Sequence, residues 1–203
     1  MKITLTQTGK RYNREWIFRN CNLVFESGST YAITGVNGSG KSTLLQVIAG
    51  AIMASEGDVV FEKEGNKIEI AEHFEHCSIV APYLELIEEM TALELLQFHR
   101  QFKQWTRPLP EILQHVGLEK AAHKQIRYYS SGMKQRLKLA QAFFSNTSLL
   151  LLDEPTTNLD QKGIDLYHQL IREHSSNRIV IVCSNDENEY SFCRQIIRME
   201  EYK

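Results

Sequence analysis

The feature that most constrains the fold is a glycine-rich turn between an apolar segment and a helical one. Residues 35–42 read Gly-Val-Asn-Gly-Ser-Gly-Lys-Ser and fit the pattern G-x-x-x-x-G-K-[ST] without a mismatch. Residues 30–34 before it have the composition of a strand, and residues 42–49 after it predict a helix that stops at Gly50. Ordinary composition would produce this pattern by chance in roughly 1 in 100 chains of this length. Strand, turn and helix together predict a P-loop, the name kept below for residues 35–42.

The residue types of the P-loop suit the phosphates of a nucleotide. Glycines let backbone N–H groups converge on phosphate oxygens, and the N-terminus of the following helix adds positive potential there. Lys41 supplies a point charge for the β- and γ-phosphates, and the Ser42 hydroxyl is placed to ligate Mg²⁺. We therefore predict that the chain binds a nucleoside triphosphate with Mg²⁺. The predicted binding residues are Gly35, Val36, Asn37, Gly38, Ser39, Gly40, Lys41, Ser42 and Thr43.

A second candidate element places two carboxylates directly after an apolar strand. Residues 149–152 are four leucines, and Asp153 and Glu154 follow them. Open α/β sheets bind ligands at the carboxyl ends of their strands, so this strand delivers both side chains to that edge. Taken alone, such a pair is equally often a solvated strand end, but the P-loop upstream favours a functional role. We expect Asp153 to hold Mg²⁺ and Glu154 to orient and deprotonate an attacking water.

The order of apolar segments predicts the fold class. Strand patterns alternate with helical patterns over most of the chain, which indicates an α/β protein with a wound parallel sheet. Residues 3–6 and 22–25 predict an N-terminal pair of strands before the P-loop. A helical stretch at about residues 83–145 interrupts the sheet as an inserted subdomain. The length of 203 residues fits a single domain over residues 1–203.

Composition excludes several classes of function. Lys and Arg number 23 against 25 Asp and Glu, and the net charge of −2 gives no electrostatic case for a nucleic-acid partner. A membrane-spanning helix needs about 20 apolar residues, and the longest apolar run considered, residues 149–152, has four. The N-terminus lacks the apolar stretch of a signal peptide. Four cysteines without C-x-x-C spacing favour reduced core thiols. We therefore expect a protein that works in the cytoplasm or docked on its membrane.

A third element, residues 129–136, reads Tyr-Ser-Ser-Gly-Met-Lys-Gln-Arg. Small residues at a helix start form a second anion-binding terminus, where the Ser130 hydroxyl can donate. This element precedes Asp153 by only 23 residues with a helix between, so the chain cannot easily fold it onto its own P-loop. A second subunit would bring it there.

With these elements the chain resembles the ATP-binding cassette (ABC) family over essentially its whole length. Residues 129–133 resemble a variant of the L-S-G-G-Q signature, and residues 153–160, Asp-Glu-Pro-Thr-Thr-Asn-Leu-Asp, resemble the Walker B motif and D-loop. The resemblance implies a P-loop NTPase fold of the RecA-like type, with an N-terminal antiparallel β subdomain. The short single cassette is similar to the ATPase subunits of ABC-2-type and haem-exporter-like transporters.

The resemblance also implies partners and further site residues. Two subunits would sandwich ATP between the P-loop of one and the signature of the other, and the signature contacts would come from Ser130, Ser131 and Gly132. Tyr12 stands where the family places an aromatic that stacks on adenine. Separate transmembrane permease subunits would receive the motion through residues 82–90. The subunit would then lie peripherally on the cytoplasmic face of the membrane, as a homodimer or paired with a different cassette.

Three departures from the family pattern bear on activity. Pro82 stands in the slot of a glutamine that contacts magnesium and water, and proline offers no side-chain donor. Residues 183–186 read Cys-Ser-Asn-Asp where the family has a histidine, and Asn185 can donate to a γ-phosphate only as a neutral amide. Met133 replaces the last glutamine of the signature. Losing one transition-state donor costs about 10²- to 10³-fold in rate, so we expect slow ATP hydrolysis with the catalytic residues Glu154, Lys41 and Asn185.

Of three alternative functions, one stays open and two are disfavoured. A regulatory cassette would act as an ATP-dependent dimerisation switch with little hydrolysis, and Pro82 and Asn185 favour it. A soluble cassette acting on ribosomes or DNA is disfavoured, because the chain has one cassette, no basic linker and no long insert. A GTPase is disfavoured because the chain lacks the base-reading N-K-x-D motif. The nearest match, residues 66–69, reads Asn-Lys-Ile-Glu, which ends in the wrong acid and lies at the wrong place in the chain.

Overall fold

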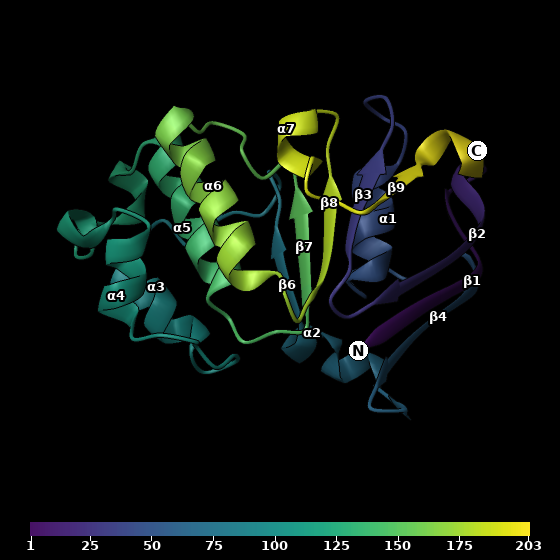
Figure 1. The fold of residues 1–203 in the computed structure, drawn as a ribbon, viewed down its shortest axis with the longest axis horizontal. Helices are drawn as coiled ribbons and strands as arrows, with labels where there is room; N and C mark the ends of the chain where they lie inside the picture. Colours follow the sequence, from purple (N-terminus) through teal and green to yellow (C-terminus); the bar gives the residue numbers. More distant parts are fainter.

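The computed structural model describes all 203 residues, which form two β-sheets flanked by helices (Figure 1). One sheet has five strands, all paired in parallel in the order β6-β7-β8-β3-β9. Its strands are β3 (Thr30–Thr34), β6 (Cys77–Val80), β7 (Leu149–Asp153), β8 (Ile179–Cys183) and β9 (Gln195–Arg198).

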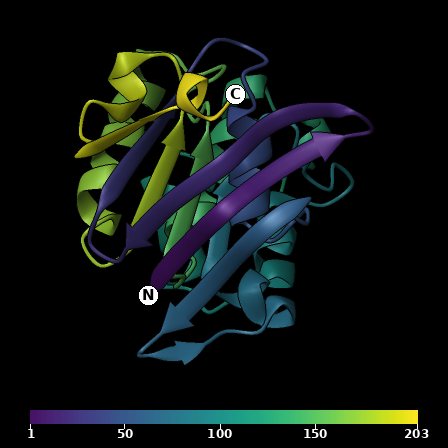
Figure 2. The ribbon, with the colours of Figure 1, turned by 90° about the vertical axis from the view of Figure 1, so that its right-hand side faces the viewer.

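The second sheet is antiparallel and comes mainly from the N-terminal part of the chain, in the order β2-β1-β4-β5. Figure 2 shows its three long strands side by side in front of the rest of the molecule. Its strands are β1 (Lys2–Tyr12), β2 (Glu15–Glu26), β4 (Glu56–Lys63) and β5 (Asn66–Lys67).

The helices lie on both faces of the parallel sheet. In Figure 1, α5 (Ser131–Phe143) and α6 (Gln161–His174) cover one face, with α3 (Ala92–His99) and α4 (Leu109–His115) beyond them. Helix α1 (Lys41–Ile48) packs on the other face, beneath the antiparallel sheet. The remaining helical turns are α2 (His73–His76), α7 (Glu187–Tyr190), η1 (Ile70–Glu72), η2 (Glu119–Ala121), η3 (Ile126–Tyr128) and η4 (Met199–Tyr202).

The alternation of side chains along β7 and β8 divides the core in two. Leu150, Leu152, Val180 and Val182 face the cluster that includes α3 to α6. Leu149, Leu151, Ile179 and Ile181 face the cluster built from α1 and the antiparallel sheet. Both strands are buried on both faces, as central strands of a wound α/β sheet are. The architecture therefore confirms the predicted α/β class with an N-terminal antiparallel sheet.

The predicted elements differ from the structure mainly at their ends. Strands β1 and β2 are longer than the two strands predicted at residues 3–6 and 22–25, because register shifts and positive φ angles at Gln7 and Asn20 break the alternation. Pro110 lies in the first turn of α4, where its missing N–H costs nothing. None of the helices is long and apolar enough to cross a lipid bilayer.

Candidate nucleotide-binding site

The parallel sheet brings the candidate residues to one edge. Strands β7, β8 and β3 are neighbours, and the chain leaves their carboxyl ends at Asp153, Cys183 and Thr34. The P-loop follows β3, the carboxylate pair ends β7, and Asn185 lies two residues past β8. Segments far apart in the sequence therefore meet at the edge where wound α/β sheets bind ligands.

The P-loop has the conformation that its glycines allow. Gly40 precedes α1 with φ 100°, and a Cβ there would lie 2.6 Å from the Ile17 Cγ2 atom. Gly35 has φ 147°, and a Cβ there would lie 2.7 Å from the Ser39 Oγ atom. No side chain caps the N-terminus of α1, so its first N–H groups have no side-chain partner. Glycine at both positions and an uncapped helix start fit an anion-binding loop.

Lys41 is a buried cation without a carboxylate partner. Only 6% of the residue is exposed, and its Nζ donates to the Gly35 carbonyl at 2.6 Å and to the Val36 carbonyl at 3.4 Å. No ion pair involves this ammonium group. A buried charge is normally paired, so the site lacks the negative group that phosphate oxygens would supply.

The P-loop borders a pocket of about 300 Å³. The Ser39 Oγ atom beside it is buried and has no hydrogen-bond partner. The pocket is lined by Ile17, Asn37, Gly38, Ser39, Gly40, Lys41, Ser42, Thr43 and Glu154. The structure thus brings Glu154 to the same pocket as the P-loop residues.

Asp153 has the properties of a metal ligand. The residue is 2% exposed, and its Oδ2 atom is buried without a hydrogen-bond partner. Burial raises the pKa of Asp153, while a hydrogen bond from Ser42 and the Lys41 charge act in the opposite direction. A buried carboxylate oxygen that lacks a partner, next to a serine hydroxyl, fits the oxygen ligands that Mg²⁺ requires.

Glu154 lies at the mouth of the pocket in a strained turn. Its backbone has φ 45°, its N–H donates to the Cys183 carbonyl at 2.9 Å, and its side chain is exposed. The turn that follows Glu154 is held by Glu189 of α7. The buried Glu189 carboxylate accepts hydrogen bonds from the Thr156 amide (2.8 Å) and from the Thr156 hydroxyl. The exposed Glu154 carboxylate can therefore contact a water in the pocket.

Asn185 lies against the P-loop and uses both polar atoms of its side chain there. Its Oδ1 accepts from the Gly35 N–H at 3.3 Å, and its Nδ2 donates to the Asn37 Oδ1 at 3.2 Å. The residue before it extends the sheet, since the Ser184 N–H donates to the Ile33 carbonyl at 3.3 Å. The amide thus joins the first residue of the loop to the third.

The predicted signature residues lie outside this pocket. Ser130 is the N-cap of α5, where its Oγ accepts from the Met133 N–H at 3.2 Å. Ser130 and Ser131 are exposed, and Gly132 packs close to the Asn158 carbonyl. The chain does not bring this helix start to its own P-loop, so any contact with phosphate there needs a second molecule.

Tyr12 also lies outside the pocket. It ends β1 at the hairpin, is 49% exposed, and has the Lys10 Nζ 5.1 Å from its ring centroid. Ile17 of β2 lines the pocket instead, and its side chain was missed because nothing in the local pattern shows where a strand residue lies relative to a distant loop. Tyr12 as an adenine contact stays a prediction.

Two further residues near the site were missed. Tyr83 follows Pro82 in the turn after β6; burial raises its pKa, and its hydrogen bond to Gln46 lowers it. The Asp153 charge also raises the pKa of Tyr83, which puts the phenol near the carboxylate edge. Glu200 of η4 accepts from the Val36 N–H at 3.3 Å. Both contacts join distant parts of the chain, so a local pattern carries no signal for them.

Comparisons with known proteins agree with this geometry. A model of the ABC transporter family matches residues 18–157. The chain is 33% identical over 194 residues to the cytochrome c biogenesis ATP-binding export protein CcmA of Histophilus somni, a match that covers 92% of this chain and 88% of CcmA. It is 34% identical over 207 residues to the high-affinity zinc uptake system ATP-binding protein ZnuC of Bacillus subtilis, with 93% and 87% covered.

A solved structure is similar over nearly the full length. It is a dimeric ATP-binding cassette in a post-hydrolysis state with bound ADP and Pi, and it superposes with a TM-score of 0.80 at 26% identity. The superposition covers 97% of this chain and 93% of that cassette. The family match, these relatives and the shared fold lead to one conclusion: the chain belongs to the ABC transporter family.

Proposed function

We propose that this chain is the ATP-binding and ATP-hydrolysing subunit of an ABC transporter. It powers transport through separate membrane subunits, by closure of a cassette dimer when ATP binds. The observation that carries the proposal is the buried Asp153 carboxylate, whose Oδ2 lacks a partner beside Ser42 and the P-loop. A structural carboxylate would be paired, whereas this one is arranged for a ligand.

The residues divide the chemistry among themselves. Lys41 and the P-loop amides hold the β- and γ-phosphates and balance their charge. Ser42 and Asp153 are the residues that would hold Mg²⁺, which supplies further charge neutralisation when bound. Glu154 accepts the proton of the attacking water, because its exposed carboxylate faces the same pocket. Hydrolysis is slow, because Pro82 replaces a side chain that could order that water.

The active unit is a dimer on the cytoplasmic face of the membrane. Ser130, Ser131 and Gly132 of one subunit complete the phosphate site of the other, since the exposed start of α5 lies outside its own pocket. Residues 82–90 contact the transmembrane permease. The cassette of known structure that binds ADP and Pi is a dimer, which supports the same assembly here.

The test uses the Glu154→Gln variant, which keeps the shape of the side chain but cannot take a proton at neutral pH. Light scattering with and without Mg-ATP measures the mass of the particle, and phosphate release measures turnover. We expect a monomer that becomes a dimer with Mg-ATP, and a turnover roughly 10²- to 10³-fold below wild type. The wild-type chain with ADP is the control and should stay monomeric.

Other outcomes separate the alternatives. If wild type and Glu154→Gln both close with ATP and neither releases phosphate, the chain is a regulatory switch and the proposed hydrolysis is wrong. A protein that binds ATP yet stays monomeric contradicts the homodimer and points to a different cassette as partner. Absence of ATP binding would contradict the whole proposal.

A further inference from the structure

We propose that Asn185 acts first as a positioning residue, which together with Asn37 clamps the P-loop in the shape that accepts a nucleotide. The proposal rests on the proposed function, because it concerns the same pocket. It differs from the expected role of Asn185 as a donor to the γ-phosphate. The structure commits both polar atoms of the Asn185 amide to the P-loop, one to Gly35 and one to Asn37.

The geometry explains why such a clamp is useful. The loop contains three glycines with positive φ angles, and such a segment loses much conformational freedom when it is ordered. The tip of the loop is open to solvent, with Val36 70% exposed, so packing does little to hold it. Asn185, in contrast, lies two residues past β8, whose parallel pairing with β3 continues to its last residue, Cys183, opposite Ile33.

Each hydrogen bond of the clamp has a distinct effect. The bond to the Gly35 N–H fixes the start of the loop against β8, and the bond to Asn37 fixes the third residue, which lines the pocket. Holding both in place before binding lowers the entropic cost of binding. Because the β-phosphate of ADP already sits in the loop, the clamp should help ADP and ATP equally. A donor to the γ-phosphate would help ATP alone.

The experiment compares ADP and ATP affinities in three variants by calorimetry, with ATP measured in the Glu154→Gln background to prevent turnover. Asn185→Leu keeps the size of the side chain and removes both bonds, whereas Asn37→Ala removes one. We expect Asn185→Leu to weaken ADP and ATP binding by the same factor, roughly 3- to 10-fold. The double variant should bind almost as Asn185→Leu does, because the two residues share one bond.

A matched control is Asn188→Leu, in α7, three residues after Asn185. Asn188 hydrogen-bonds Asp186 and not the P-loop, so its replacement should leave both affinities unchanged. Thermal denaturation checks that each variant is folded. Unchanged ADP affinity in Asn185→Leu, with ATP affinity reduced 3-fold or more, would overturn the clamp in favour of a γ-phosphate donor. Wild type that fails to bind either nucleotide would overturn the proposed function instead.

Discussion

Two polar clusters lie at opposite ends of the parallel strands, and their buried charged groups differ in the partners they have. At the carboxyl ends, Lys41 and Asp153 are buried without ion-pair partners. At the amino ends, the buried Arg178 precedes β8, and its guanidinium donates to the Phe143 carbonyl at 3.0 Å and to the Ser145 carbonyl. Arg178 thereby satisfies the last carbonyl of α5, that of Phe143, and adds a second donor to the Ser145 carbonyl, which also accepts from the Thr147 N–H at 2.9 Å.

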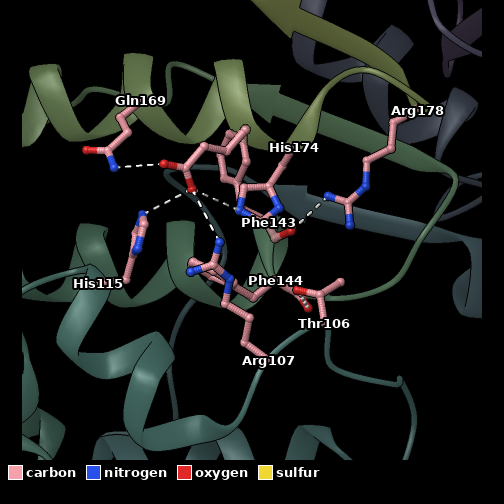
Figure 3. Close-up of polar contacts among 9 residues, drawn as sticks. Thr106, Arg107, His115, Phe143, Phe144, Gln169, His174 and Arg178 are labelled. Carbon is pink, nitrogen blue, oxygen red and sulfur yellow. Dashed lines mark hydrogen bonds and ion pairs between the residues drawn. The ribbon is translucent and has the colours of Figure 1, made fainter.

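The neighbours of Arg178 extend the second cluster toward α4 (Figure 3). Glu173 accepts from the Gln169 amide at 2.8 Å and lies 3.4 Å from His115, 3.8 Å from His174 and 3.8 Å from Arg107. Glu173 thus has four polar neighbours, whereas the Nε2 atoms of His115 and His174 make no hydrogen bond. The comparison separates two arrangements: at the carboxyl ends a buried acidic oxygen, Asp153 Oδ2, lacks a donor, whereas at the amino ends the Glu173 carboxylate is surrounded by donors from the chain itself.

The largest effect on stability is expected from Arg178→Met. The change removes a buried cation together with its hydrogen bonds to two carbonyls and takes this donor from the Phe143 carbonyl at the end of α5, which lowers the free energy of unfolding by about 3 kcal/mol. Urea denaturation measures it, and Arg172→Met, on the exposed face of α6, is the control. Nucleotide affinity of the folded variant should not change. Reduced affinity with unaltered stability would contradict the division between the two clusters.

Asp153→Asn tests the cluster at the carboxyl ends of the strands. Burial raises the pKa of Asp153, so the folded chain holds a proton there more readily than the unfolded chain, and the carboxylate destabilises the fold at neutral pH. The neutral amide should therefore stabilise the nucleotide-free protein and weaken the dependence of ATP affinity on Mg²⁺.

The measurement is urea denaturation at pH 7 without nucleotide, followed by ATP titration with Mg²⁺ and with EDTA. Asp165→Asn, an exposed position on α6, is the control and should change neither result. A loss of stability in Asp153→Asn would mean that the carboxylate has a structural partner, which would remove the main support for a metal site.

The sequence predicted the functional edge better than the opposite one, for a physical reason. The P-loop and the carboxylate pair are contiguous, and their chemistry requires particular residue types at fixed spacing, so residues 35–42 and 153–154 could be identified from a single chain. Strand β3 was predicted to the residue, at 30–34, because it is short, buried and bounded by turns.

Contacts between distant residues could not be predicted in this way. Asn185 as a donor to the γ-phosphate stays a prediction, and nothing in the local pattern indicated that its amide contacts Asn37, 148 residues away. Arg178 carries no local signal at all, since a lone arginine before a strand is usually solvated. The partners are backbone carbonyls for Arg178, and the Gly35 N–H and the Asn37 side chain for Asn185, and a sequence pattern does not record where such distant atoms lie.

The smallest expected effect is a pH dependence of stability that comes from His174, in the cluster around Glu173. Burial lowers the pKa of His174 to about 4, so the folded chain keeps this imidazole neutral where the unfolded chain protonates it. The unfolded state then binds more protons between about pH 6.5 and pH 4, and stability falls as the pH is lowered through that window. From pH 7 to pH 5 the loss from His174 should be about 2 kcal/mol. Urea denaturation at the two pH values should show it, and His174→Asn should reduce it, whereas replacing the exposed His123 should not. An equal pH slope in His174→Asn would mean that His174 is already protonated in the fold, and that Glu173 holds it as a true ion pair.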